Sequence, residues 1–310
     1  MRVGLIGVGT MGSAIGMNIL RAGYELVVHD IRPQQVAPHR EAGAIVADSP
    51  NQLAQLCEVV LTSLPGPEEV EAVSCGSRGL LQGIGDGKAY FDLSTSSPAL
   101  ARRLHAEFLA RNADMLDAPV SGGPYGAASG RLAMWIGGRE QAYLRHRDLL
   151  ESIGDEIWYV GESGAGSIAK LVHNCAGFIM YAALAETFSM GIKAGLAPDV
   201  LWQTVRKGLH GRRPMFDSMA RNFLPSSYDD ADFRLELGAK DVGLATELAA
   251  EHGVPMALAA HALEELQAAL ARGWADKDAR VSMLLQLERA GLEPLSVSAE
   301  RIAEIMNAGE

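Results

Sequence analysis

Short apolar runs alternate with longer stretches of helical periodicity along the first half of the chain. A strand that is covered on both faces reads as a continuous apolar run, and consecutive parallel strands are joined by helices. The pattern therefore predicts an α/β domain with a doubly wound parallel sheet. The expected strands are Arg2–Ile6, Glu25–His29, Val59–Ser63, Ala89–Asp92, Asp114–Ala118, Leu132–Ile136 and Glu156–Val160, and the clearest helices between them are Met11–Arg21 and Pro98–Arg111.

The strand-like runs stop near Gly161, and the rest of the chain has the periodicity of helices. Gly164–Gly191 is one long, mostly apolar helical stretch, and glycine- and proline-rich breakers separate the helices that follow it. We therefore expect an α/β domain in residues 1–161 and an all-α domain in residues 162–310. The further expected helices are Pro198–Lys207, Met215–Arg221, Leu235–His252, Met256–Arg272, Ala279–Ala290 and Ser298–Met306.

The uncharged run Val3–Leu20 is as long as a membrane span, but its glycines and polar side chains disfavour insertion. It contains Gly7-Val8-Gly9-Thr10-Met11-Gly12, a GxGxxG motif that follows an expected strand and opens an expected helix. The three glycines would permit a tight turn, close approach of a pyrophosphate, and close packing of the helix on the strand. We expect a dinucleotide to contact Gly7, Gly9, Thr10, Met11 and Gly12 at the helix N-terminus.

Asp30 ends the second expected strand, where an acid accepts hydrogen bonds from the adenosine ribose and repels a 2′-phosphate. It therefore favours NAD over NADP as the cofactor. Arg32 follows closely enough to pair with such a phosphate, so NADP stays open. A glycine turn without a ligand is the alternative to a nucleotide site, and the order of strand, motif, helix and acid favours the nucleotide.

Composition narrows the class of protein. The chain has 310 residues, of which 48% are hydrophobic and 21% charged, a typical globular balance. A net charge of −11 argues against a nucleic-acid partner, and no further apolar stretch suggests a membrane. Cys57, Cys75 and Cys175 have no paired or metal-binding spacing. This favours a reduced, cytoplasmic protein without structural disulfides or a metal.

The long apolar helix carries polar residues on one face. Lys170, Asn174, Gly177 and Tyr181 follow one another at helical spacing, so they should line a cleft. A desolvated lysine has a lowered pKa and can exchange a proton near neutral pH. A lysine that extends to the surface near a helix start is the alternative interpretation.

Two segments with small and hydroxyl side chains follow expected strands. Asp92–Pro98 reads as a helix cap, or as a nicotinamide contact at a strand's carboxyl end. Asp117–Gly130 holds Ser121 among glycines whose backbone N–H groups could form a carboxylate-binding concavity. A flexible strand-to-strand loop is the alternative for the second segment.

The combination of these segments resembles the β-hydroxyacid dehydrogenase family, which includes 3-hydroxyisobutyrate dehydrogenases and tartronate semialdehyde reductases. The matching segments are Gly4–Leu20, Asp92–Pro98, Asp117–Leu132, Gly164–Asn174 and Phe233–Ala245. The resemblance implies a Rossmann domain that binds NAD or NADP, a long interdomain helix, and a helical domain in a homodimer or homotetramer. The implied reaction is hydride transfer between nicotinamide and a small 3-hydroxy acid or its semialdehyde.

The resemblance also implies roles for individual residues. Lys170 matches the catalytic general acid or base, and Asn174 matches the asparagine that helps to hold the substrate. The implied loop for the substrate carboxylate is Ser121, Gly122 and Gly123. The further implied cofactor contacts are Leu64, Pro65, Thr95 and, from the helical domain, Lys240.

Two positions depart from the family pattern. His173 stands where the hydroxyisobutyrate branch usually has asparagine, and Lys170–Asn174 resembles 6-phosphogluconate dehydrogenase, where this histidine contacts substrate. This suggests a more hydroxylated, sugar-acid-like substrate, with a packed helix residue as the alternative. Gly238 and Ala239 stand where relatives often carry a lysine, which implies fewer cofactor contacts.

Three other functions stay open. A short 6-phosphogluconate-type oxidative decarboxylase needs a phosphate pocket, for which Arg212 and Arg213 beside His210 are candidates, although a solvated loop is the plainer interpretation. An imine reductase shares the implied architecture but usually lacks a lysine at the position of Lys170. A non-catalytic dinucleotide-sensing module would need only the first domain.

Overall fold

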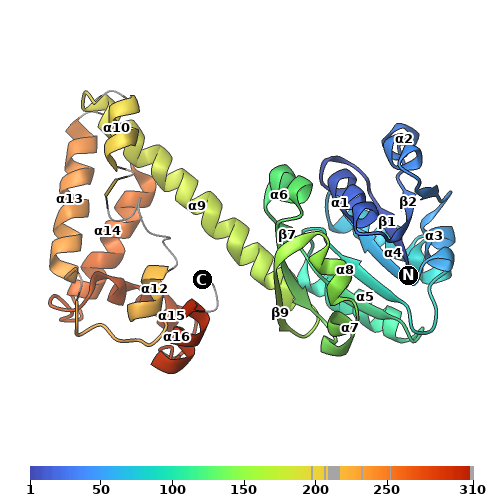
Figure 1. Ribbon diagram of the computed structural model, residues 1–310. Coiled ribbons are helices and arrows are strands. Elements are labelled where there is room, and N and C mark those ends of the chain that lie inside the picture. Colours follow the sequence, from blue (N-terminus) through green and yellow to red (C-terminus); the bar gives the residue numbers. More distant parts are fainter. Residues whose placement is uncertain (197, 206, 209–216, 232, 252, 308–310) are drawn as a thin grey trace. The chain divides into compact units, whose positions relative to one another are not determined.

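The computed structural model of the chain describes residues 1–196, 198–205, 207–208, 217–231, 233–251 and 253–307 (Figure 1). Contacts along the backbone group the chain into two compact units, Met1–Ala176 and Gly177–Glu310. The division falls within the long helix α9, Ala165–Lys193. The expected long helix over Gly164–Gly191 is therefore confirmed to within two residues at each end.

The first unit is built on a nine-stranded sheet with the order β3-β2-β1-β4-β5-β6-β8-β7, in which β9 pairs with β8. The six strands from β3 to β6 run parallel, and the strand order reverses between β1 and β4. The strands are β1 Arg2–Ile6, β2 Glu25–His29, β3 Ile45–Val46, β4 Val59–Thr62, β5 Ala89–Asp92, β6 Asp114–Asp117, β7 Val120–Ser121, β8 Leu132–Gly137 and β9 Gly154–Gly161.

The far end of the sheet departs from the expected parallel pattern, because β8 runs antiparallel to both β6 and β7. Only about ten residues connect β7 to β8, and a parallel crossover needs a dozen or more. The short helix α6, Gly123–Ser129, occupies this connection. Ser121 therefore lies at the end of a short strand, followed at once by a helix, and not in the flexible loop considered as an alternative.

Helices connect the strands and cover both faces of the sheet, so that one apolar core lies on each face. Neighbouring residues of one strand enter different cores: Leu5 and Val28 belong to one cluster, and Ile6 and Val27 belong to the other. This alternation is what a doubly wound sheet requires, so the expected fold class is confirmed. The helices are α1 Thr10–Arg21, α2 Pro33–Glu41, α3 Pro50–Leu56, α4 Pro67–Cys75, η1 Leu80–Gln82, α5 Pro98–Leu109, α7 Glu140–Arg145 and α8 Arg147–Glu151.

The named elements of the second unit, within its described residues, are all helices. Its buried core consists of Tyr228, Leu235, Ala269, Val281 and Leu285. The expected helix over Ala279–Ala290 begins as a 3₁₀ turn, and the others lie close to their expected bounds. The elements are α10 Pro198–Val205, α12 Asp217–Asn222, α13 Leu235–Glu251, α14 Ala257–Leu270, η2 Ala279–Ser282, α15 Met283–Arg289 and α16 Ala299–Asn307.

The described residues include neither a membrane-spanning helix nor a cluster of metal ligands. None of the helices that can be described is both long and apolar enough to cross a membrane. Within the same residues, no group of three or more His, Cys, Asp or Glu side chains is arranged to hold a metal ion.

Candidate active site

The carboxyl ends of the central strands lie side by side along one edge of the sheet. Pairing aligns the last residues of β2, β1, β4, β5 and β6, which are His29, Ile6, Thr62, Asp92 and Asp117. The segments that follow these residues therefore share one edge, and the strand order reverses there between β1 and β4. In open α/β sheets, such a reversal point is where a dinucleotide binds.

The glycine motif forms a tight turn that only glycines can make. Gly7 has a φ of +84°, and a Cβ at this position would lie 2.4 Å from the carbonyl oxygen of Ser63. A Cβ on Gly12 would lie 1.9 Å from the carbonyl oxygen of Gly7. At Gly9 the nearest atom to an added Cβ is a guanidinium nitrogen of Arg32, at 3.3 Å. A side chain at Gly9 would thus approach the Arg32 side chain and no backbone atom within 4 Å.

Asp30 is tied to this turn. Its Oδ2 accepts a hydrogen bond from the backbone N–H of Val8 at 3.0 Å, and its Oδ1 accepts one from the N–H of Arg32 at 2.9 Å. The side chain is only 5% exposed, whereas that of Arg32 is 54% exposed and lies 3.4 Å from the same carboxylate. The structure therefore places an acceptor and a cation together beside Gly9, as expected for the adenosine end of a dinucleotide site.

A buried network joins the loops after β4 and β5. Asp92 Oδ1 accepts hydrogen bonds from the Thr62 hydroxyl at 2.8 Å and from the Ser94 N–H at 3.0 Å. The Ser94 hydroxyl in turn accepts a hydrogen bond from the N–H of Leu64 at 3.0 Å. The network thereby fixes the segments that hold Leu64, Pro65 and Thr95, the expected cofactor contacts.

The network confines a carboxylate to the protein interior. Asp92 is 2% exposed, and its burial raises the pKa of the carboxyl group to about 6 despite the hydrogen bonds it accepts. Sequence reasoning treated this segment as a helix cap or a nicotinamide contact and missed the link between the two loops. The available signal was an aspartate at the end of a buried strand, two residues before a serine.

Asp117 anchors the start of helix α9. Its carboxylate accepts hydrogen bonds from the backbone N–H groups of Gly164 at 2.8 Å and Ser167 at 2.7 Å. The side chain is 2% exposed, and a Cβ on Gly166 would lie 2.6 Å from the carbonyl oxygen of Asp117. Glycine thus permits the helix to start directly against β6. This anchor was also missed, because its partners lie roughly fifty residues apart in sequence.

Lys170 lies one turn beyond this anchor and is 8% exposed. Burial lowers the pKa of its amine. Its Nζ lies 5.9 Å from the ring centroid of Trp135, a residue that the sequence did not single out. At 8% exposure, this lysine does not extend to the surface as the alternative interpretation requires.

His173 contacts both Ser121 and Trp135. Its Nε2 lies 3.1 Å from the Ser121 hydroxyl, and its ring centroid lies 5.1 Å from that of Trp135 at a tilt of 45°. Although His173 is an exposed residue, desolvation by its neighbours and the charge of Lys170 lower its pKa, which favours its neutral form at neutral pH. The structure thus brings together three residues expected at the substrate site: Ser121, Lys170 and His173.

The structure describes fewer contacts for the other expected site residues, and some of them lie outside its described part. Gly122 and Gly123 are exposed beside Ser121, and both have positive φ values, +131° and +59°. Asn174 is partly buried, one turn after Lys170. Lys240 belongs to helix α13, but its side chain and that of Tyr181 lie outside the described part of the structure. The residues His210, Arg212 and Arg213 also lie outside the described residues.

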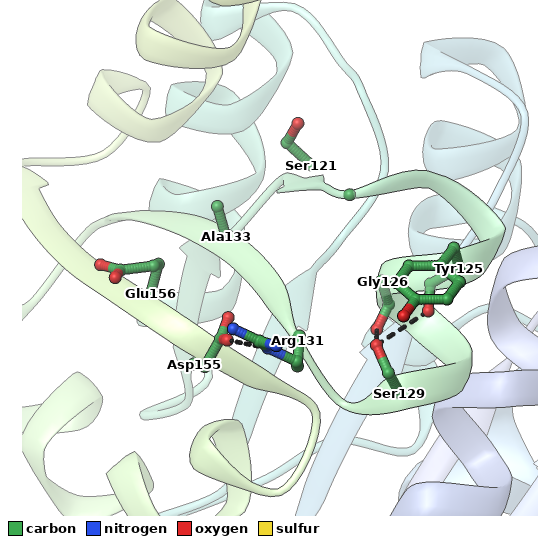
Figure 2. Close-up of a pocket in the computed structure, with 9 residues that line it drawn as sticks. Ser121, Tyr125, Gly126, Ser129, Arg131, Ala133, Asp155 and Glu156 are labelled. Atoms are coloured by element: carbon green, nitrogen blue, oxygen red, sulfur yellow. Dashed lines mark hydrogen bonds and ion pairs between the residues drawn. The ribbon is translucent and has the colours of Figure 1, made fainter. Parts of the chain in front are cut away.

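A hollow of about 450 Å³ opens next to Ser121 (Figure 2). Its floor is the small side chain of Ala133, which pairs with Ser121 on one side and with Glu156 on the other. Arg131 donates through Nε to Asp155 at 2.7 Å, so this cation is already paired. The full lining is Ser121, Gly122, Tyr125, Gly126, Ser129, Arg131, Ala133, Asp155 and Glu156.

Comparisons with known proteins place the whole chain among dehydrogenases. Residues 2–161 match the family model of the NAD-binding domain of 6-phosphogluconate dehydrogenase, and residues 164–294 match the NAD-binding model of NADP-dependent 3-hydroxyisobutyrate dehydrogenase. The NAD-dependent L-serine dehydrogenase of Pseudomonas aeruginosa is 34% identical over 89% of this chain and 95% of its own. The 3-hydroxyisobutyrate dehydrogenase of the same organism is 34% identical over 78% of this chain and 83% of its own.

A solved structure supports the same grouping. The 3-hydroxyisobutyrate dehydrogenase of Mycobacterium tuberculosis, determined with L-serine, is 30% identical and has a TM-score of 0.64. The match covers 92% of this chain and 98% of that one. The similarity therefore extends over both units and is not confined to the nucleotide-binding half.

Proposed function

We propose a substrate class and a lysine-dependent mechanism for this chain, which belongs to the β-hydroxyacid dehydrogenase family of NAD(P)-dependent oxidoreductases. The reaction is hydride transfer between nicotinamide and the carbinol carbon of a small 3-hydroxy acid. In the reverse direction, the reacting atom is the carbonyl carbon of the semialdehyde. The observation that carries the proposal is the buried amine of Lys170, which lies in one cluster with Ser121 and His173.

The residues along the sheet edge fit the dinucleotide. The turn from Gly7 to Gly12 offers backbone N–H groups to the pyrophosphate, and Asp30 offers carboxylate oxygens to the adenosine ribose. Leu64, Pro65 and Thr95 would border the nicotinamide. The family resemblance implies Lys240 as a further contact with the cofactor. The nicotinamide, when bound, supplies the hydride acceptor or donor, and the protein supplies orientation and proton transfer.

Lys170 would exchange the proton of the substrate hydroxyl. As a neutral amine it accepts this proton during oxidation, and as an ammonium it donates one to the carbonyl oxygen during reduction. Burial lowers its pKa and so brings both forms closer to equal population near neutral pH. Asn174, one turn along the helix, would hold the same oxygen, and Ser121, Gly122 and Gly123 would bind the carboxylate.

The hollow beside Ser121 supports a substrate with polar substituents. Its lining offers the hydroxyl groups of Ser121, Tyr125 and Ser129, together with the carboxylate of Glu156. Because Arg131 is paired with Asp155, the charges around the hollow do not favour a second anion such as a phosphate. We therefore place hydroxylated or aminated 3-hydroxy acids ahead of phosphorylated sugar acids.

NAD is the proposed cofactor, because the buried carboxylate of Asp30 would repel a 2′-phosphate and already engages Arg32. Residues 1–161 would form the cofactor-binding domain, and residues 162–310 would form the domain that supplies Lys170 and Asn174 to the substrate and makes the contacts of a homodimer or homotetramer. The oligomer can be determined from the mass of the purified protein by light scattering.

The test is nicotinamide absorbance with purified protein. NAD and NADP are paired with 3-hydroxyisobutyrate, glycerate, serine, threonate, gluconate and 6-phosphogluconate, and the reduced cofactors with glyoxylate, succinic semialdehyde and tartronate semialdehyde. We expect turnover that falls about 10²–10⁴-fold in Lys170→Ala, the usual contribution of a general acid or base. Lys193→Ala, which removes an exposed lysine of the same helix, is the matched control and should retain turnover.

Each other outcome has a clear meaning. Undiminished turnover in Lys170→Ala would remove this residue from the mechanism. Release of carbon dioxide with 6-phosphogluconate would identify an oxidative decarboxylase instead. Tight cofactor binding without turnover on any member of the panel would favour a dinucleotide-sensing module.

A further inference from the structure

The side chain of Trp135 lies on the same face of the sheet as that of Ala133, which forms the floor of the hollow beside Ser121. In strand β8, Met134 and Ile136 are fully buried in the core, so Ala133 and Trp135 point to the opposite face. Trp135 pairs in register with Trp158 of β9, but the two side chains have different surroundings. Trp158 is 47% exposed and donates from its indole N–H to Glu156. Trp135 instead lies against helix α9.

The Trp135 ring contacts two residues of that helix. The ammonium nitrogen of Lys170 lies 5.9 Å from its centroid, and the imidazole of His173 lies 5.1 Å from it. An aromatic face attracts a cation through the ring quadrupole, and indole does so best. Among the described residues, no carboxylate pairs with Lys170. The indole ring is therefore the group in the described structure that favours the charged form of this lysine.

We propose that Trp135 is a positioning residue for the reaction, whose ring holds the Lys170 ammonium and the His173 imidazole on one surface and so fixes where the substrate proton is exchanged. The inference rests on the proposed role of Lys170. It adds a residue from a different strand to the site, and it explains why a buried lysine without a carboxylate partner keeps a defined position.

The inference has a measurable consequence, because the ring and burial act in opposite directions on Lys170. Burial disfavours the ammonium, and the indole face favours it. Among the described residues, the polar groups on the elements packed here are His173 and Asn174 on α9, Ser121 on β7, and Asp117 on β6, whose carboxylate is held by the N–H groups of Gly164 and Ser167. Replacing the indole by an aliphatic side chain should therefore lower the pKa of Lys170 further.

The experiment titrates the lysine directly. The chain has six lysines, so isotope-labelled lysine side chains give few NMR signals, and Lys170→Arg identifies the signal of Lys170. We expect Trp135→Leu to lower the pKa of Lys170 by about half a unit, the effect of a modest cation–π contact. Trp135→Phe keeps an aromatic face and should lower it less. Trp158→Leu, the matched control on the neighbouring strand, should leave it unchanged.

The pH dependence of kcat/KM is a second measurement, and a residue with only a structural role would not shift it. In the reduction direction, the alkaline limb of the kcat/KM profile should move to lower pH in Trp135→Leu and stay in place in Trp158→Leu. A fall in kcat/KM by the same factor at every pH, without movement of the limb, would contradict the inference. An unchanged or raised pKa of Lys170 in Trp135→Leu would also overturn it, because the ring would then act only by excluding water.

The two proposals fail in different ways. If Lys170→Ala keeps full turnover, the proposed mechanism falls, whatever the titration shows. If Lys170→Ala loses turnover but Trp135→Leu and Trp158→Leu titrate alike, the mechanism stands and the role of Trp135 falls. Trp135→Phe keeps the second measurement informative if the leucine variant does not fold.

Discussion

Replacing Asp92 by asparagine tests whether the cofactor loops are held by a carboxylate that is costly to keep charged. The Asp92 side chain is 2% exposed and accepts hydrogen bonds from Thr62 and Ser94 through one oxygen. Asparagine retains a carbonyl oxygen that can accept both bonds, and it removes the charge. The substitution therefore separates the electrostatic role of this residue from its role as an acceptor.

The magnitude follows from the pKa of this group. Burial raises the pKa of Asp92 from 3.8 to about 6 in the folded protein. Because the folded state then binds the proton more tightly than the unfolded state, this stabilising contribution is full below about pH 4 and is lost as the pH rises through about 6. The whole effect is about 3 kcal/mol, of which about 1.4 kcal/mol is lost between pH 5 and pH 8.

Urea denaturation followed by circular dichroism at pH 5, 6, 7 and 8 measures the effect. The stability of Asp92→Asn relative to the wild type should rise by about 1.4 kcal/mol from pH 5 to pH 8. Asp148→Asn removes an exposed carboxylate of helix α8 and should run nearly parallel to the wild type over the same range. If Asp92→Asn also runs parallel to the wild type, the carboxylate does not titrate near pH 6 and the reasoning is refuted.

Three further substitutions test the remaining parts of the site. Asp117→Ala leaves two buried N–H groups without their acceptor, so we expect a loss of about 2–4 kcal/mol in urea denaturation together with a lower kcat; unchanged stability would show that the anchor is dispensable. Gly12→Ala places a methyl group 1.9 Å from the Gly7 carbonyl oxygen, and fluorescence titration should show cofactor affinity at least about tenfold weaker. Gly243→Ala, in an open position of α13, is its control and should bind normally. Asp30→Ala should narrow the preference for NAD over NADP in kcat/KM by about tenfold, and an unchanged ratio would assign cofactor choice to other residues.

The strands that the sequence predicts best have at least three consecutive buried residues. Arg2–Ile6, Glu25–His29 and Ala89–Asp92 match β1, β2 and β5 residue for residue, because a continuous apolar run between glycines or polar turns has few other structures open to it. The two-residue strands β3 and β7 were not predicted. Two residues carry no periodicity, and these strands exist only because a neighbouring strand offers hydrogen bonds.

The same distinction applies to the site residues. Some can be predicted from their neighbours in sequence, and others depend on contacts with distant parts of the chain. The glycine turn, Asp30 and the helix face with Lys170 could be predicted because each depends on residues close together in sequence. Trp135 and Asp117 could not, because a tryptophan inside a strand or an aspartate at a strand end is ordinary in sequence. Their importance comes from helix α9, which begins against β6 and passes over β8. The roles proposed for the predicted residues remain predictions until the variants are measured.

The distribution of charge around the cluster supports the proposed role of Lys170 in proton exchange. The buried carboxylates Asp92 and Asp117 accept hydrogen bonds from backbone N–H groups, and these bonds hold a loop and a helix start in place. Had a carboxylate paired with Lys170, the ion pair would have raised the pKa of the amine and held its proton. In the described structure the neighbours of Lys170 are instead an indole ring and a histidine whose pKa is lowered. Under the proposed mechanism, the indole ring orients the ammonium without an ion pair that would hold its proton, as a general acid and base in a reversible hydride transfer requires.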